Sequence, residues 1–122
     1  MKPLKKIITI LEDDRDIREI CTMLFSDEGY SVHSFENITD LSKAYPKDHT
    51  NLFLLDIQLP DGNGLDLCEK LKADPIYRNI PVLMMSANLK SGNSIQQSHA
   101  DGFIEKPFDI SGLLDRVAIL LS

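Results

Sequence analysis

Residues 52–56 read Leu-Phe-Leu-Leu-Asp, four consecutive apolar residues followed by a carboxylate. A strand that is apolar at successive positions, and not only at alternate ones, is typical of a sheet covered by helices on both faces. Residues 7–11 and 82–85 have the same character, and weaker apolar runs cover residues 32–35 and 103–104. The sequence therefore predicts five short strands in a parallel sheet.

Helical spacing of apolar residues fills most of the segments between these runs. Four such segments are clear: 17–25, 38–45, 67–71 and 110–121. Gly29 and Pro46 are expected to end the first two helices, and Asp109 to cap the last one. Residues 89–100 contain few helix formers, so the predicted fourth of five helices is weak. Strands that alternate with crossover helices predict a doubly wound α/β fold.

Length and charge limit the possible functions. The 122 residues, 43% hydrophobic and 26% charged, fit one globular domain spanning 1–122. Thirteen basic against nineteen acidic residues give a net charge of −6, which argues against direct binding of nucleic acid or an anionic membrane. No apolar run approaches the roughly 20 residues of a membrane span, and the first residues lack a secretory signal, so a cytoplasmic location is expected. Cys21 and Cys68 are predicted to be buried free thiols.

Polar side chains follow the predicted strands at the points where each strand ends. Asp13 and Asp14 follow the first run, Asp56 the third, Ser86 the fourth and Lys106 the fifth. Parallel strands end along one edge of a sheet, where ligands bind, so these side chains should lie together. Two carboxylates about 5 Å apart repel by roughly 3 kcal/mol at an effective dielectric constant near 20. The three aspartates therefore predict a site for a hard divalent cation, Mg²⁺ or Mn²⁺.

The remaining residues of this edge suit phosphoryl transfer. Lys106 and Ser86 can contact phosphoryl oxygens, and the Asp56 carboxylate can attack phosphorus to form an aspartyl phosphate without a general base. Each residue taken alone has a simpler explanation, since an acidic residue after a strand often caps the next helix, as we would favour for Asp14 alone. Their placement after separate apolar runs favours one joint site.

Four segments of the chain resemble the response-regulator receiver domain of two-component signalling, and together they cover essentially all of it: 10–14, 54–64, 81–87 and 100–108. The resemblance implies a flavodoxin-like sheet with the strand order 2-1-3-4-5, flanked by five helices. It implies that Asp56 is the phosphoacceptor and that Ser86 and Lys106 contact the phosphoryl group. It also implies that Mg²⁺ is held by Asp13, Asp14, Asp56 and the backbone carbonyl of Gln58.

The same resemblance implies a signalling role. A histidine kinase or a phosphotransfer protein would donate the phosphoryl group, and the domain would catalyse its own phosphorylation and dephosphorylation without being an enzyme that turns over a substrate. Ser86 and Phe103 would form the switch, which packing would drive because Phe103 has no hydroxyl. The peptide bond between Lys106 and Pro107 would be cis. A downstream partner would bind the face made by the fourth helix, fifth strand and fifth helix.

Three other functions fit the sequence less well. A phosphohydrolase of the haloacid-dehalogenase type would need a carboxylate two residues after the nucleophile, where Gln58 stands. A flavodoxin-like electron carrier would need a phosphate-binding loop after the first strand, where Glu12, Asp13 and Asp14 would repel the flavin phosphate. A degenerate receiver that only binds partners is disfavoured because every expected site residue is present. Whether residues 89–100 form an element ordered by phosphorylation or a variable loop is left open, as is whether the chain acts alone or within a longer protein.

Overall fold

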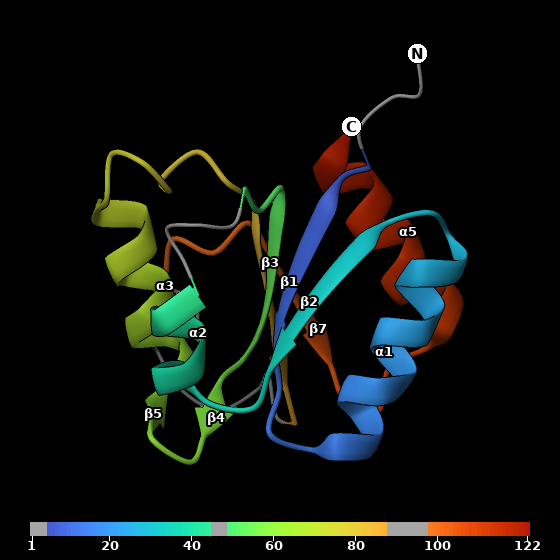
Figure 1. The fold of residues 1–122 in the computed structure, drawn as a ribbon, viewed down its shortest axis with the longest axis horizontal. Helices are drawn as coiled ribbons and strands as arrows, with labels where there is room; N and C mark the ends of the chain where they lie inside the picture. Colours follow the sequence, from blue (N-terminus) through green and yellow to red (C-terminus); the bar gives the residue numbers. More distant parts are fainter. Residues whose placement is uncertain (1–4, 45–48, 88–97) are drawn as a thin grey trace.

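Five strands form one parallel sheet in the order β2-β1-β3-β6-β7 (Figure 1). The computed structural model describes residues 5–44, 49–87 and 98–122. The strands are β1 (Ile7–Leu11), β2 (Ser31–Phe35), β3 (Leu52–Asp56), β6 (Val82–Ser86) and β7 (Gly102–Glu105). The first strand thus lies between the second and the third, which confirms the predicted doubly wound topology.

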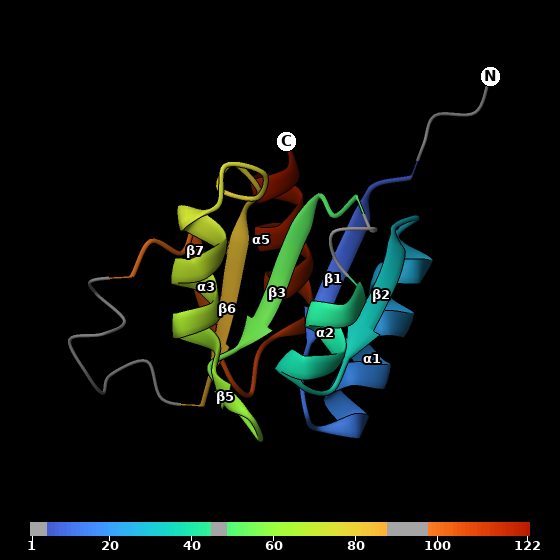
Figure 2. The same ribbon diagram turned by 60° about the vertical axis from the view of Figure 1, so that its left-hand side comes forward.

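Helices cover both faces of the sheet, as the consecutive apolar runs predicted. The described helices are α1 (Arg15–Asp27), α2 (Ile38–Ala44), α3 (Gly64–Ala73) and α5 (Ile110–Leu121). Figures 1 and 2 show α1 and α5 on one face, with α2 and α3 on the other. The predicted helix within residues 89–100 falls largely at 88–97, outside the described residues.

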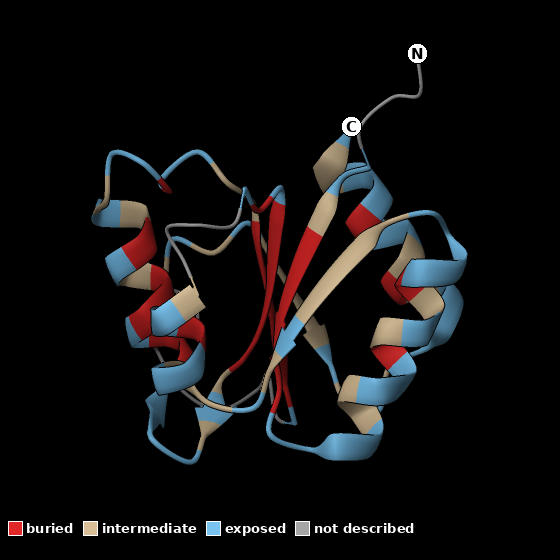
Figure 3. Ribbon diagram, viewed as in Figure 1, coloured by how far each residue is buried: buried red, intermediate tan, exposed pale blue. Residues whose placement is uncertain are grey.

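Two apolar clusters lie on the two sides of the sheet. One packs Cys21 and Phe25 of α1 with Leu113 and Val117 of α5, and the other contains Leu41 of α2 and several side chains of α3. Every residue of the central strands β3 and β6 is buried, as Figure 3 shows. Cys21 and Cys68 are buried free thiols, as predicted. Within the described residues, no helix is both long enough and apolar enough to span a bilayer.

Local signals explain where the helices begin and end. Asp14, Asn63 and Asp109 cap α1, α3 and α5 by accepting hydrogen bonds from backbone N–H groups of the first turn. Gly29 follows α1 with a φ of 95°, a left-handed conformation that favours glycine. Asp109 and Gly29 agree with the start and stop that the sequence indicated, while Pro46 lies outside the described residues.

A short antiparallel hairpin follows the third strand of the sheet and was not predicted. It pairs β4 (Gln58–Leu59) with β5 (Gly62–Asn63) and leads into α3. Strands of two residues carry no hydrophobic periodicity, so the pattern of the sequence did not reveal them. A Cβ atom at Gly64 would lie 2.0 Å from the backbone oxygen of Asp56, so only glycine fits where the chain returns to the strand end.

Candidate functional site

The strand ends bring the predicted residues to one edge of the sheet. The register pairs Asp56 with Met85, the residue before Ser86, and pairs Ser86 with Glu105, the residue before Lys106. The backbone N–H of Lys106 donates to the carbonyl of Ser86 at 2.8 Å. Asp56, Ser86 and Lys106 therefore lie together, as the parallel topology predicted.

Lys106 links two carboxylates at the centre of the site. Its Nζ donates to Asp56 Oδ2 at 3.0 Å and also to Glu12 Oε1. The Glu12 side chain is fully buried and that of Asp56 nearly so, whereas the Lys106 side chain keeps 17% of its surface exposed. Burial acts to lower the pKa of Lys106, but the hydrogen bonds to Glu12 and Asp56 outweigh it and raise this pKa. Lys106 is therefore a cation in this site.

Three carboxylates converge beside this lysine. Glu12, Asp13 and Asp56 each offer an oxygen, and these oxygens lie within 4.8 Å of one another. Burial, followed by the neighbouring Asp56 carboxyl, raises the pKa of Glu12 to about 8 against the opposing effect of Lys106. The second oxygen of Glu12, Oε2, is buried and has no hydrogen-bond partner among the residues that the structure describes. A set made only of oxygen donors, including this buried oxygen, fits a hard divalent cation such as Mg²⁺ or Mn²⁺.

The structure places Asp14 differently from the sequence-based expectation. Asp14 was predicted to help hold the metal, but its Oδ1 accepts from the backbone N–H groups of Asp16 and Ile17, at 2.9 and 3.1 Å, and so caps α1. In the cluster of three carboxylates, Glu12 occupies the place that was predicted for Asp14. Its backbone N–H donates to Phe35 O at 3.0 Å, which extends the pairing of β1 and β2 by one residue and buries Glu12. The sequence offered one signal for this role, because Glu12 directly follows the apolar run of residues 7–11.

The other predicted site residues lie at or near the same edge. Ser86 is buried at the end of β6. The backbone N–H of Gln58 donates to Asp56 Oδ1 at 3.3 Å, while its carbonyl as a metal ligand stays a prediction. Phe103 in β7 is partly buried and packs against the apolar cluster on the α3 side. The peptide bond between Lys106 and Pro107 is cis, as the resemblance implied.

Two residues near the site were missed by the sequence reasoning. Arg18 of α1 donates through Nη1 to the backbone oxygen of Glu12 at 2.8 Å and, less closely, to that of Asp13 at 3.4 Å. Asp61, in the turn of the hairpin, accepts three hydrogen bonds from the start of α2. Both contacts join separate elements, so no local pattern in the sequence indicates them.

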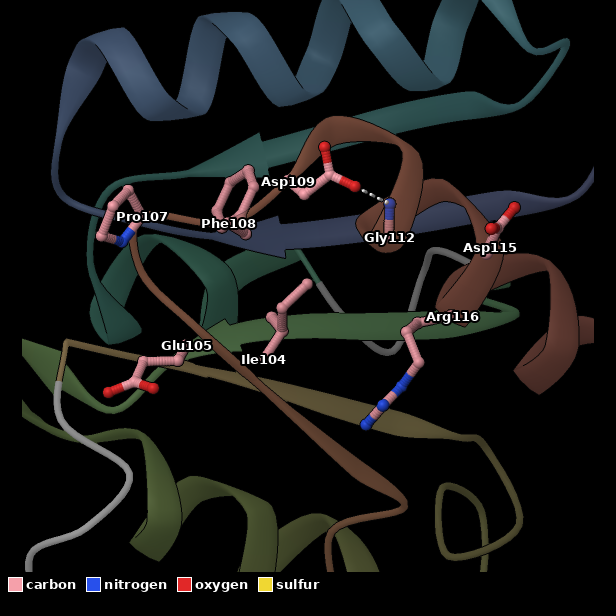
Figure 4. Close-up of a pocket in the computed structure, with 8 residues that line it drawn as sticks. All are labelled: Ile104, Glu105, Pro107, Phe108, Asp109, Gly112, Asp115 and Arg116. Atoms are coloured by element: carbon pink, nitrogen blue, oxygen red, sulfur yellow. Dashed lines mark hydrogen bonds between the residues drawn. The ribbon is translucent and has the colours of Figure 1, made fainter.

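A cavity of about 420 Å³ lies between β7 and α5 (Figure 4). Its wall includes Glu105 and Pro107, the two neighbours of Lys106 in the sequence. Figure 4 shows Arg116 extending from α5 toward β7, where its Nη2 donates to the carbonyl of Phe103 at 2.9 Å. The remaining lining residues are Ile104, Phe108, Asp109, Gly112 and Asp115. The segment that supplies Lys106 to the site thus also forms part of this cavity.

Comparison with known proteins agrees with this geometry. A family model described as the response regulator receiver domain matches residues 8–118. The chain belongs to this family. As a receiver domain it has the predicted fold, and neither the phosphohydrolase nor the flavin-carrier alternative is supported.

Curated relatives include transcription regulators. The phosphate regulon transcriptional regulatory protein PhoB of Pseudomonas aeruginosa is 32% identical over 118 residues, 95% of this chain and 52% of that protein. The DNA-binding response regulator MtrA of Mycobacterium tuberculosis is 30% identical over 119 residues, 96% of this chain and 51% of that protein. The receiver domain described here therefore spans about half the length of these curated relatives.

Solved structures match the fold over nearly the whole chain. A CheY-like response regulator receiver domain protein from Methanospirillum hungatei has a TM-score of 0.88 and 28% identity, covering 97% of this chain and 94% of its own. The chemotaxis response regulator CheY4 of Vibrio cholerae has a TM-score of 0.88 at 20% identity, covering 97% of this chain and all of its own. At that identity the second match supports the fold alone.

Proposed function

We propose that this receiver domain accepts a phosphoryl group on Asp56 from the phosphohistidine of a histidine kinase or a phosphotransfer protein. The observation that carries the proposal is the contact between Lys106 Nζ and Asp56 Oδ2 at 3.0 Å, beside the carboxylates of Glu12 and Asp13. One buried carboxylate thus lies within a group that combines a fixed cation with oxygen ligands for a metal. An aspartyl phosphate is the chemistry that this combination serves.

The positions of the side chains support this transfer. An oxygen of the ionised Asp56 attacks phosphorus, the bond between phosphorus and the histidine nitrogen breaks, and its electron pair stays on the imidazole. Lys106 and the Ser86 hydroxyl neutralise charge on the phosphoryl oxygens by donating hydrogen bonds. Glu12, Asp13 and Asp56, with the Gln58 carbonyl, would hold Mg²⁺, or Mn²⁺ in its place. When bound, the cation supplies positive charge that offsets the repulsion between carboxylates and phosphate.

Phosphorylation would change the surface that a partner recognises. The phosphoryl group adds negative charge and acceptor oxygens beside Ser86, which sits in the strand next to Phe103. Rotation of the Ser86 hydroxyl toward the phosphate would give the partly buried Phe103 ring space to move inward. Glu105 and Pro107 flank Lys106 and line the cavity in Figure 4, so a shift of Lys106 would reach the face of β7 and α5. We place the binding of a downstream partner there.

The domain would act in the cytoplasm as a signalling phosphoacceptor. It would catalyse its own phosphorylation and dephosphorylation, without direct contact with nucleic acid or a membrane, which its net charge of −6 disfavours. The contrasting possibility is a receiver that binds partners without phosphorylation. The site favours phosphorylation, since a module that only binds partners has no need of a buried acidic group around a lysine.

The test is intact-mass analysis after incubation with Mg²⁺ and acetyl phosphate. We expect the wild-type protein to gain the mass of one phosphoryl group and D56N to gain none, because the amide is not a nucleophile. D66N is the matched control, since Asp66 is an exposed aspartate in the first turn of α3. Equal phosphorylation of D56N, or no phosphorylation of the wild-type protein, would refute the proposal.

A further inference from the structure

The hairpin of β4 and β5 connects the phosphoacceptor strand to α3. At its base, the backbone N–H of Gln58 donates to Asp56 Oδ1 at 3.3 Å. The chain closes behind this contact through the N–H of Gly64, which donates to Ile57 O at 2.7 Å. The position of the hairpin therefore decides where a backbone donor meets the Asp56 carboxylate.

The turn of this hairpin is bound to a distant helix through Asp61. Asp61 Oδ1 accepts from the N–H of Ile38 at 2.9 Å, and Oδ2 accepts from the N–H and the hydroxyl of Thr39 at 2.9 and 2.7 Å. These hydrogen bonds, first that from Ile38 and then those from Thr39, lower the pKa of Asp61. An ionised carboxylate at the start of a helix also interacts favourably with the helix dipole.

Packing holds the same two elements together. A Cβ atom at Gly62, next to Asp61, would lie 2.7 Å from Cδ1 of Ile38, so the turn lies directly against α2. The helix also has a cap of its own, because Asn37 Oδ1 accepts from the N–H of Asp40 at 2.7 Å. Asn37 and Asp61 satisfy different N–H groups at the start of α2, and of these two side chains Asp61 is the one that joins the helix to the hairpin.

The hydrogen bonds of Asp61 to α2 complete a closed series of contacts around the site. The hairpin is bonded to Asp56 at its base and, through Asp61, to α2 at its turn. Only two residues separate α2 from Phe35, the end of β2, whose carbonyl accepts from the N–H of Glu12 at 3.0 Å. Glu12 and Asp56 then meet again at Lys106. Loss of the Asp61 hydrogen bonds would break this series at the turn of the hairpin and leave packing alone to hold the turn against α2.

We propose that Asp61 is a positioning residue for the phosphoacceptor site, acting by binding the turn of the β4–β5 hairpin to the start of α2. The inference rests on the proposed function and adds to it a residue that touches neither phosphate nor metal. Residues that orient the groups around a metal typically contribute about tenfold to a hundredfold to metal affinity or activity. Asp61 would act in this way on the backbone beside Asp56.

The experiment compares D61A, D61N and N37A with the wild-type protein. The measurements are Mn²⁺ affinity by electron paramagnetic resonance, the rate of phosphorylation by acetyl phosphate, and hydrogen exchange of the Gln58 and Gly64 amides without metal. We expect D61A to lose about tenfold in both Mn²⁺ affinity and rate, and its two amides to exchange faster. D61N should lose less, because its amide oxygen still accepts from Ile38. N37A weakens the same helix without touching the hairpin, so it should keep wild-type affinity, rate and exchange.

The outcomes separate this inference from the proposed function. Unchanged amide exchange in D61A would overturn the positioning role, and so would unchanged Mn²⁺ affinity and rate. An equal loss in N37A would also overturn it, since the stability of α2 alone would then explain the effect. A wild-type protein that gains no phosphoryl group would refute the proposed function, while metal affinity and amide exchange would still decide the role of Asp61. If the wild-type protein bound no Mn²⁺, amide exchange alone would decide it.

Discussion

Lys106 brings one positive charge to two buried carboxylates, and its position follows from the backbone as much as from charge. The bond from its N–H to Ser86 O extends the pairing of β6 and β7, and its Nζ then reaches Asp56 and Glu12. Removing one member of a buried ion pair leaves a charge without compensation, which is more costly than breaking an exposed pair. Lys106 therefore matters to the charge balance of the site before any phosphate arrives.

Substituting Lys106 by methionine tests this role in phosphoryl transfer. We expect K106M to be phosphorylated by acetyl phosphate about a hundredfold more slowly, because removing one fixed donor from developing negative charge typically costs about 10²–10³ in rate. Time-resolved intact-mass analysis measures the rate, and circular dichroism verifies the fold. K70M is the matched control, since Lys70 is exposed on α3. A K106M rate equal to that of K70M would show that Lys106 does not act on the phosphoryl group.

The sequence predicted which residue types meet at the site, but it did not predict which of the neighbouring acidic residues after β1 joins the site and which caps α1. Asp56, Ser86 and Lys106 each follow a separate strand, so the parallel topology alone brings them together. Glu12 and Asp14 are two residues apart, and their roles depend on where β1 stops pairing with β2 and where α1 begins. That choice is set by backbone geometry over two or three residues, which composition and periodicity do not determine.

Some helices begin at a signal in the local sequence, whereas others begin where a residue distant in the sequence contacts them. Asp109 begins α5 by accepting from the N–H of Gly112 at 3.1 Å, a short-range contact that the sequence indicated. The start of α2, in contrast, depends on a distant residue. Asp61 accepts from the backbone N–H groups of Ile38 and Thr39, which lie 23 and 22 residues earlier in the chain. The β4–β5 hairpin was missed for the same reason, because its position depends on contacts with Asp56 and α2 and not on its own pattern.

Removing the cap of α5 should destabilise the domain without abolishing the site. We expect D109A to lower the free energy of unfolding by about 1 kcal/mol, because Gly112 N–H loses its acceptor at the start of the helix. Urea denaturation measures this difference. D115A, which removes an exposed carboxylate farther along the same helix, serves as the control. Equal stability of D109A and D115A would show that the cap contributes little.

The carboxylates of Glu12, Asp13 and Asp56 and the amine of Lys106 lie together at one edge of a sheet whose strands β3 and β6 are fully buried. Helices cover both faces of the sheet and bury its central strands, so the strand ends are where charged side chains of the sheet reach solvent or each other. In Figure 1 the C-terminal end of α5 lies at the end of the molecule opposite β4 and β5. The end of α5 and the site edge are therefore at opposite ends of the sheet.

If the cluster of Glu12, Asp13 and Asp56 binds a divalent cation, as proposed, the stability of the whole domain should depend on that cation. A ligand that binds only the folded state stabilises it by RT ln(1 + [L]/Kd), about 2.7 kcal/mol at one hundred times Kd. We therefore expect the unfolding temperature to rise with Mg²⁺ or Mn²⁺ concentration, as differential scanning calorimetry would measure. E12Q keeps one oxygen for Lys106 but replaces the second carboxyl oxygen of Glu12 with an amide nitrogen, which cannot bind the cation, so it should reduce the rise.

Two controls separate specific binding from general screening of charge. E19Q removes an exposed carboxylate that pairs with Arg15 on the surface of α1, so it should keep the wild-type rise. Sodium chloride at matched ionic strength screens the net charge of −6 without offering a divalent ion to Glu12, Asp13 and Asp56. Two results would show that the three carboxylates do not bind a cation together. One is an equal rise in unfolding temperature with sodium chloride, and the other is an equal rise for E12Q and E19Q with divalent ions. A rise confined to divalent ions and weakened only by E12Q would tie the stability of the fold to this edge of the sheet.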